Sequence, residues 1–183
     1  QVIHRADQIL RERRAREREH AIRTLKRLEE KQAKAESDQQ QLARFSIDSA
    51  RYYMDESPYG APEPVIDLKV TNGTDQTISE LLLRGVVTSP GRSVPWVDEA
   101  FYYVVSGGIE PGETLAWSLA PNRFGPWGEP QIPGNAELTV SLEGVRDANA
   151  QPLWESPALS ESEVAKLERL REEYGGVVLS RAD

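Results

Sequence analysis

The sequence predicts a mainly β fold with flanking helices: an immunoglobulin-like antiparallel β-sandwich, preceded by a long N-terminal helix and closed by a short C-terminal helix. Its first 44 residues contain no glycine or proline and consist mostly of good helix formers. The middle of the chain alternates apolar and polar residues between turn signals, which is typical of antiparallel strands. We therefore expect a charged helix over residues 1–44, a β-sandwich over 45–158, and a helix with a tail over 159–183.

The N-terminal helix is predicted to be long and partly self-supporting. Acidic side chains precede basic ones by four positions, and each such pair stabilises an exposed helix by about 0.2–0.5 kcal/mol. These pairs are Asp7/Arg11, Glu12/Arg16, Glu19/Arg23 and Glu30/Lys34. A thin apolar stripe of heptad spacing is formed by Ala21, Leu25, Leu28, Ala35 and Leu42, and it is interrupted by Gln32 and Gln39. Two interpretations stay open: a coiled coil that joins copies into a homo-oligomer, or a single solvated helix that acts as a spacer.

About seven short strands are expected over some 110 residues, which is the number and spacing of an immunoglobulin-like sandwich. They cover residues 45–53, 66–71, 78–87, 101–105, 114–119, 137–143 and 153–154. Gly85 is expected to mark a bulge. Asn72-Gly73 and Glu110-Pro111-Gly112-Glu113 predict turns, the second of type II because proline and glycine suit its two central positions. Asn72-Gly73-Thr74 also matches a glycosylation sequon, and we interpret it only as a turn.

The C-terminal helix is expected to begin with a capping box, because Glu163 follows Ser160 by three positions. It should run to Tyr174 and end at Gly175-Gly176, since glycine commonly ends helices. We expect this helix to pack on the sandwich. Residues 177–179 are expected to form either an edge strand or a tail.

Composition excludes several classes of protein and of site. The 183 residues include no cysteine, so neither a disulfide framework nor a cysteine metal site is expected. His4 and His20 both lie in the predicted N-terminal helix without a third ligand nearby, so we expect no metal and no cofactor. Residues 52–183 carry 9 basic and 21 acidic side chains, a balance that argues against nucleic acid as a partner. No membrane-spanning segment, start methionine or secretory segment is recognised, so the chain is expected to be a mature or trimmed fragment.

The motifs of the middle region carry a resemblance to a known family. They are Val70-Thr71-Asn72-Gly73-Thr74, Ser89-Pro90-Gly91-Arg92-Ser93-Val94-Pro95-Trp96, Gly107-Gly108-Ile109-Glu110-Pro111-Gly112-Glu113, Leu119-Ala120-Pro121-Asn122 and Trp127-Gly128. In this order, followed by an acidic helix, they resemble an uncharacterised family of bacterial envelope lipoproteins. The resemblance implies a periplasmic or cell-envelope domain that is lipid-anchored in its precursor, and it implies no known activity. Membrane contact is expected only through an anchor that this chain lacks.

The candidate binding residues lie in two predicted loops. They are Arg92, Trp96, Asn122, Arg123, Phe124 and Trp127. Exposed tryptophan and arginine carry binding energy at protein interfaces, and tryptophan faces also stack on sugars. The structural alternative is that the two tryptophans cover the open end of the sandwich while the arginines bind loop carbonyls. A serine triad needs a nearby histidine, and both histidines lie in the N-terminal helix, so we do not expect an enzyme. We expect a structural or adaptor protein of the cell envelope that docks a protein partner. A glycan- or peptide-binding module that uses the Arg/Trp loops is the alternative.

Overall fold

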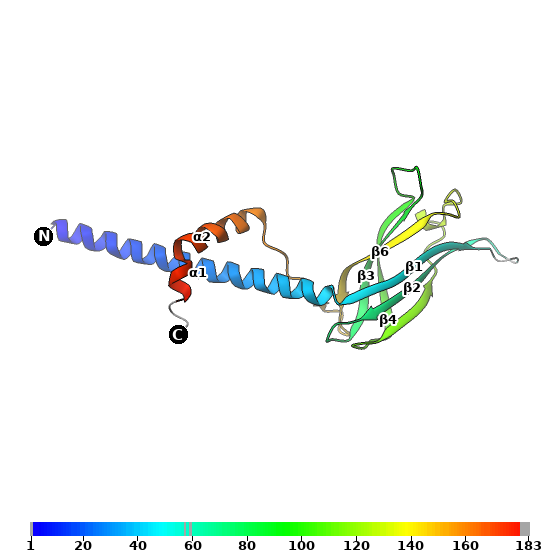
Figure 1. Ribbon diagram of the computed structural model, residues 1–183, viewed down its shortest axis with the longest axis horizontal. Coiled ribbons are helices and arrows are strands. Elements are labelled where there is room, and N and C mark those ends of the chain that lie inside the picture. The colour runs from blue at the N-terminus through cyan, green and yellow to red at the C-terminus, as the bar shows by residue number, and fades with distance from the viewer. Residues whose placement is uncertain (1, 57, 59, 180–183) are drawn as a thin grey trace. The chain divides into compact units, whose positions relative to one another are not determined.

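The computed structural model describes residues 2–56, 58 and 60–179, and it divides the chain into two compact units (Figure 1). The helical unit comprises Gln1–Asp38 and Ser156–Asp183. The sheet unit comprises Gln39–Glu155. Each unit is described separately below.

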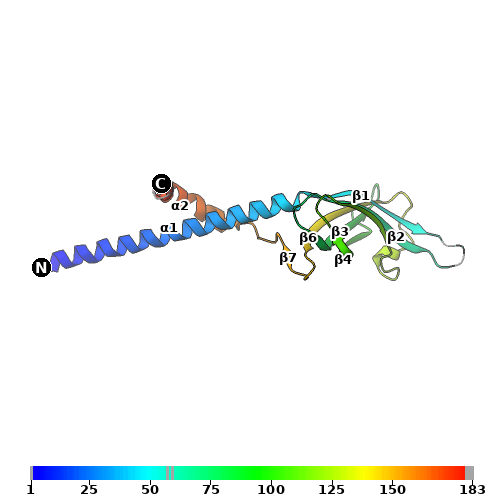
Figure 2. The same ribbon diagram turned by 90° about the horizontal axis from the view of Figure 1, so that it is seen from below.

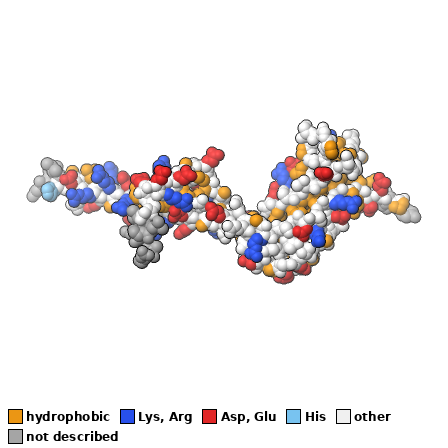
Figure 3. Space-filling view, viewed as in Figure 1, with side chains coloured by type: hydrophobic (Ala, Val, Ile, Leu, Met, Phe, Trp, Pro, Cys, Tyr) orange, Lys and Arg blue, Asp and Glu red, His pale blue; other side chains and the backbone are white. Residues whose placement is uncertain are grey.

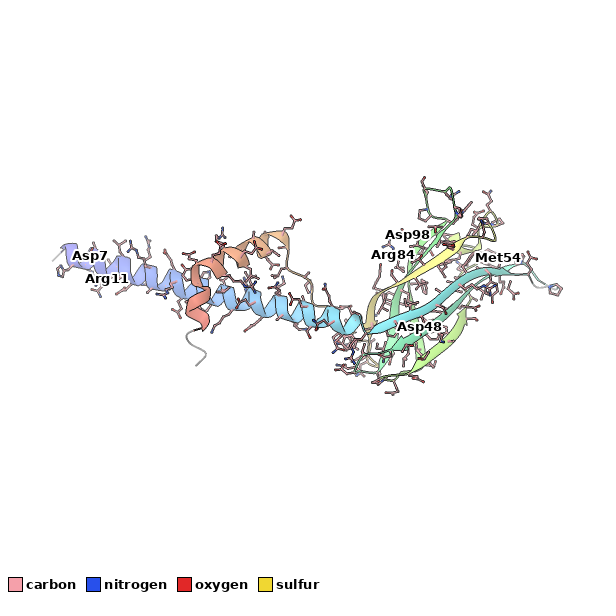
Figure 4. The ribbon with its side chains drawn as sticks, viewed as in Figure 1. Asp7, Arg11, Asp48, Met54, Arg84 and Asp98 are labelled. Carbon is pink, nitrogen blue, oxygen red and sulfur yellow. The ribbon has the colours of Figure 1, made fainter. Side chains whose placement is uncertain are left out.

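The long helix α1 (Val2–Leu42) confirms the predicted N-terminal helix. Two of its expected charge pairs form, Glu12 with Arg16 at 3.6 Å and Glu19 with Arg23 at 3.9 Å. Charged side chains of both signs cover its N-terminal part, where the labelled Asp7 and Arg11 lie one turn apart (Figures 3 and 4). These pairs are exposed, so each contributes only a few tenths of a kcal/mol. They support a helix whose N-terminal part is solvated.

The second helix, α2 (Glu161–Leu179), begins with the predicted capping box. The backbone N–H of Glu163 donates to the Ser160 hydroxyl at 3.3 Å, and the Glu163 carboxylate accepts from the Ser160 N–H at 2.9 Å. The predicted end at Gly175-Gly176 is wrong, because the helix continues through both glycines to Leu179. Residues 177–179 are therefore helical, neither strand nor tail. Glycine costs about 1 kcal/mol within a helix, and it ends a helix only where the chain turns into a left-handed conformation.

The apolar side of α2 packs against α1, whereas the sequence predicted that it packs on the sandwich. The two helices lie side by side in both ribbon views (Figures 1 and 2). Their shared core consists of the buried Leu25, Leu28, Leu167 and Leu170, flanked by partly buried Ala21, Leu159 and Tyr174. Lys31 donates to Glu163 at 2.8 Å, and Arg171 donates to Glu29 at 3.1 Å. Ala21, Leu25 and Leu28 of the apolar stripe of α1 are thus covered by a segment of the same chain.

Asp38, near the end of α1, fixes the segment that leads into α2. Its carboxylate is buried and accepts the backbone N–H of Ser156 at 2.9 Å, while Lys34 donates to the same carboxylate oxygen at 3.3 Å. Hydrogen bonding to Ser156, assisted by Lys34, lowers the pKa of Asp38 below its ordinary value of 3.8. The ionised carboxylate therefore holds the two segments of the helical unit together.

The sheet unit consists of two antiparallel sheets. The first has the strand order β1 (Phe45–Asp55), β2 (Glu63–Asn72) and β5 (Thr114–Leu119). The second has the order β4 (Val97–Ile109), β3 (Ile78–Thr88), β6 (Glu137–Arg146) and β7 (Pro152–Leu153). All seven predicted strands are present, several of them longer than expected. A core shared by both sheets shows that they pack face to face, with Leu68 and Val70 of β2 meeting Leu81 and Leu83 of β3.

Two turns behave as their sequences indicate. Gly112 has a φ of 82°, and the Glu113 N–H donates to the Glu110 carbonyl at 3.0 Å, so this turn is confirmed. The side chain of Asn72 is fully buried, and its amide nitrogen donates to the Gln76 and Ile109 carbonyls, each at 2.8 Å. The side-chain amide of Asn72 is therefore part of the turn itself, in agreement with the interpretation of Asn72-Gly73-Thr74 as a turn.

Gly85 does not mark a bulge, contrary to expectation. The register irregularities of β3 fall between Ile78 and Glu80 and between Leu82 and Leu83. A Cβ atom on Gly85 would lie 2.6 Å from the ring atom Cη2 of Trp127. Glycine is required here because the indole of Trp127 packs directly on the strand.

Candidate binding cleft between the edge strands

The sequence-predicted residues Arg92 and Trp96 lie in the loop between β3 and β4, where they contact each other. The Arg92 guanidinium lies over the Trp96 ring at 3.6 Å from its centroid. Arg92 also donates to the Val94 carbonyl at 2.9 Å, and Trp96 Nε1 donates to the Ser89 hydroxyl at 2.9 Å. One face of the Trp96 ring is thus occupied by the chain's own arginine. That face is closed to a stacking sugar.

Trp127 belongs to the core of the sheet unit. It lies in the short 3₁₀ turn η1 (Pro126–Gly128) and is only 4% exposed. Its Nε1 donates to the Glu99 carboxylate at 2.7 Å, and its carbonyl accepts from the Tyr52 hydroxyl at 2.5 Å. Its ring meets Phe101 edge-on, with the two ring centroids 6.1 Å apart. Trp127 therefore closes one end of the space between the sheets, as the structural alternative expects.

The remaining three candidates form the exposed start of the loop between β5 and β6. The Asn122 side-chain oxygen accepts the Phe124 N–H at 3.0 Å. The Arg123 guanidinium lies 4.9 Å from the Phe124 ring centroid and 3.4 Å from the Glu63 carboxylate. Phe124 is 85% exposed. The loop therefore presents an aromatic ring and an arginine to solvent.

The structure brings some of the six candidates together and separates others. Trp96 and Trp127 belong to one apolar cluster around Ile66, Val87 and Val97. Asn122 and Trp127 line a common cleft, whose described lining does not include Arg92, Trp96, Arg123 or Phe124.

That cleft is a concave feature of the sheet unit. It has a volume of about 400 Å³ and lies between β4, the last strand of one sheet, and β5, the last strand of the other. Its lining is mostly aromatic and aliphatic: Ile66, Phe101, Tyr102, Tyr103, Leu119, Ala120, Pro121 and Trp127. Apolar clefts with few polar groups are the usual form of binding sites.

Inward-facing side chains are less buried beside the cleft than in the sheet centres. Leu81 and Leu83 of the central strand β3 are completely buried, whereas Phe101 and Tyr103 of β4 are only partly buried. The Tyr103 and Trp117 rings stack across from β4 to β5, with their centroids 5.1 Å apart and planes inclined by 14°. The Trp117 Nε1 is buried and has no hydrogen-bond partner among the described residues. The seam between the two edge strands is therefore closed only in part.

Glu99 supplies the charge of the cleft. It is partly buried, and it is the one charged side chain among the described residues of the lining. One of its oxygens accepts from Trp127 Nε1, which fixes the carboxylate at the cleft wall. On the outer face of the same strand, Asp98 accepts from Arg84 of β3 at 2.7 Å (Figure 4), and this hydrogen bond lowers the pKa of Asp98. The start of β4 thus places two carboxylates on opposite faces of the strand, Glu99 at the cleft wall and Asp98 on the outer face.

Sequence reasoning missed Glu99, Phe101, Tyr102 and Tyr103 as site residues. Phe101, Tyr102 and Tyr103 were predicted as part of an aromatic-rich strand over 101–105, and Glu99 lay outside it. Nothing in that pattern indicates which strands lie at the edge of a sheet. Edge position depends on strand order, which alternation does not encode. A usable signal existed in the run from Ala100 to Ser106, which contains neither charge nor proline.

Among the described residues, no group of three or more His, Cys, Asp or Glu side chains lies in a metal-binding arrangement. No helix within the described ranges has an apolar stretch long enough to cross a membrane. Searches of protein-family models, curated proteins and solved structures return no match for this chain.

Proposed function

We propose that this chain is a non-enzymatic adaptor of the bacterial cell envelope, lipid-anchored in its precursor, whose sheet unit docks a protein partner. The helical unit serves as a spacer in this proposal. The envelope location and the anchor are supported by the resemblance of the middle motifs to bacterial envelope lipoproteins.

An immunoglobulin-like sandwich is part of the same proposal. The order β1-β2-β5 opposite β4-β3-β6-β7 supports it, because three of the six connections between consecutive strands (β2–β3, β4–β5 and β5–β6) cross from one sheet to the other, and crossing connections are typical of such folds. Domains of this architecture commonly serve recognition at cell surfaces, with binding residues at their loops and edges.

The observation that carries the docking function is the apolar cleft between β4 and β5. It combines exposed aromatic surface with a fixed carboxylate, Glu99, and these are features that recognition sites share. The glycan alternative has less support, because Arg92 covers one face of Trp96 and Trp127 is buried. Sugar stacking requires a free aromatic face.

Peptide display against the full chain tests the cleft while the partner itself is still unidentified. Random peptides are selected on the parent chain and then measured on Tyr102→Ala and Phe124→Ala. Tyr102 lies on β4 at the rim of the cleft, with its side chain on the outer face of the strand, and Phe124 lies in the loop. Both side chains are more than half exposed, so neither replacement opens the core. We expect Tyr102→Ala to weaken binding at least about tenfold and Phe124→Ala to change it less than about twofold.

The opposite ranking of the two variants would move the docking site from the cleft to the Arg/Trp loops. Selection of no peptide that depends on either residue would contradict docking of protein segments by this unit.

A further inference from the structure

We propose that the cleft receives an extended, positively charged polypeptide segment, which adds as an extra strand to the free edge of β4. This inference rests on the proposed docking function and names the mode and the partner class at the same cleft. Strand addition of this kind uses main-chain hydrogen bonds for affinity and side-chain pockets for specificity.

The edges of the two sheets are protected unequally. Exposed edge strands normally carry charges, prolines or bulges, or are very short, because an unguarded edge pairs with any available strand. On one side of the sheet unit, β1 contains Asp48, Arg51 and Asp55, and β7 has only two residues. On the cleft side, β4 carries Asp98 and Glu99 near its start and an irregular register after Val104. Its Ala100–Val104 part, like the whole of β5, contains no charge, proline or register shift. The unguarded edges are therefore those that flank the cleft.

Side chains on both faces of β4 are placed to meet an additional strand. The inward-facing Phe101 and Tyr103 are partly exposed and line the cleft, so alternate side chains of an added strand would bury them. The outward-facing Tyr102 and Val104 are 54% and 66% exposed. Outward side chains of the added strand would form cross-strand pairs with these two residues. One added strand would thus cover both faces of the edge.

Charge identifies the partner class. The sheet unit carries 16 acidic and 7 basic side chains, a net charge of −9. From Val97 to Glu113 the chain contains four acidic residues and no basic one. Asp98 is already paired with Arg84, whereas Glu99 makes no ion pair within the part of the chain that the structure describes. A second copy of β4 would bring acidic residues and no cation to Glu99. A partner segment with lysine or arginine between its apolar residues complements the cleft.

The probe for this inference is a synthetic peptide in which lysine and valine alternate, titrated into the full chain. Binding is followed by tryptophan fluorescence, since Trp127 lines the cleft. One control peptide carries N-methyl groups on alternate backbone nitrogens and cannot donate the strand hydrogen bonds. A second has glutamate in place of lysine. We expect each control to bind at least about tenfold more weakly, and we expect binding of the lysine peptide to weaken as salt is added.

Matched variants of the chain locate the contact. Val104→Lys places a guarding charge on the edge, whereas Val94→Lys adds the same charge in a loop at nearly equal exposure, 66% against 64%. We expect at least about tenfold weaker peptide binding for the first and less than about twofold for the second. Glu99→Gln keeps an oxygen for Trp127 Nε1 and removes the charge, so it should weaken binding of the lysine peptide while leaving thermal stability unchanged.

Each contrary outcome is distinct. If the N-methylated peptide binds as tightly as the lysine peptide, strand addition is wrong. The docking function is tested separately, and it still holds if Tyr102→Ala loses binding of the displayed peptides. Equal binding of the glutamate peptide would overturn the charge assignment. If Val104→Lys instead abolishes a dimer of the parent chain, the occupant is a second copy and the proposed partner class is wrong.

Discussion

Replacing Leu167 by alanine is expected to release α2 from α1 while leaving the sheet unit intact. Leu167 is 2% exposed and is one of four buried leucines that form the core between these helices. The remaining contacts are peripheral side chains and two ion pairs that are partly exposed to solvent, which contribute little. The apolar core therefore decides whether α2 stays attached.

The size of the effect follows from burial. Truncating a fully buried leucine costs about 2–5 kcal/mol, from lost transfer free energy and from the cavity left behind. For a unit of this size, each kcal/mol lowers the midpoint by roughly 4–8 °C, so the expected decrease is at least about 8 °C. α2 contains Gly175 and Gly176, each of which costs about 1 kcal/mol in a helix, so it will not remain helical alone. α1 has 41 residues and α2 has 19, and the variant should lose up to about a third of its helical signal.

Two spectroscopic probes separate the two units. All four tryptophans, Trp96, Trp117, Trp127 and Trp154, belong to the sheet unit, so their fluorescence reports only that unit. Circular dichroism at the helix band reports mainly α1 and α2. In Leu167→Ala the helical transition should move to lower temperature and the fluorescence transition should not move. Val164→Ala is the control, because Val164 lies on α2 at 40% exposure and its truncation should cost less than about 0.5 kcal/mol.

A helical transition of Leu167→Ala that superimposes on that of the parent would refute this reasoning. A simultaneous decrease in both transitions would show instead that the two units unfold as one.

Three further predictions concern single features. Replacing Arg92 and Arg123 by alanine should leave the tryptophan-detected melting midpoint within about 2 °C of the parent, because both side chains are exposed and their polar partners, the Val94 carbonyl and the Glu63 carboxylate, belong to exposed residues. A larger decrease would show that the two arginines satisfy buried groups. Gly85→Ala should destabilise the sheet unit by about 1–3 kcal/mol in urea unfolding, since the new methyl group meets the indole that covers it; unchanged stability would place that indole elsewhere. Hydrogen bonding to Ser156 lowers the pKa of Asp38, so the stability that its carboxylate gives the helical unit is complete above pH 3.8 and is lost as pH falls through the lower folded-state pKa. The melting midpoint of the helices should therefore decrease from pH 5 to about pH 2.5, and it should decrease less in Asp38→Asn. A constant midpoint, or an equal decrease in Asp38→Asn, would contradict this prediction.

The sequence predicted the secondary structure well because local signals determine most of it. Alternation located β2, β5 and β6, and runs of apolar, aromatic or β-branched residues located β3 and β4. The capping box located the start of α2 at Glu161. The end of α2 was wrong because a Gly-Gly pair permits a left-handed turn without requiring one. Gly85 was misread because a glycine required by a close-packed ring and a glycine at a bulge look identical in one sequence.

Tertiary partners could not be predicted in the same way. The apolar stripe of α1 correctly indicated a packed helix, but heptad spacing does not say whether the partner is a second copy or a distant segment of the same chain. Of the six candidate residues, Asn122 and Trp127 line the cleft, and the aromatic residues of β4 were missed because edge position depends on strand order.

Self-association through α1 stays a prediction. In the structure, α2 of the same chain occupies part of the surface of α1 that a second copy would need. The stripe residues Leu25 and Leu28 are buried against Leu167 and Leu170 of the same chain. An intramolecular partner acts at an effective concentration of about millimolar, so a second copy at micromolar concentration competes only if it binds far more tightly. Association through this stripe should therefore strengthen when α2 is released. In sedimentation, Leu167→Ala should form dimers at lower concentration than the parent or Val164→Ala. Dimers of equal strength in all three would instead assign any association to residues outside the stripe, such as the exposed Ile9 and Leu10 on the N-terminal part of α1.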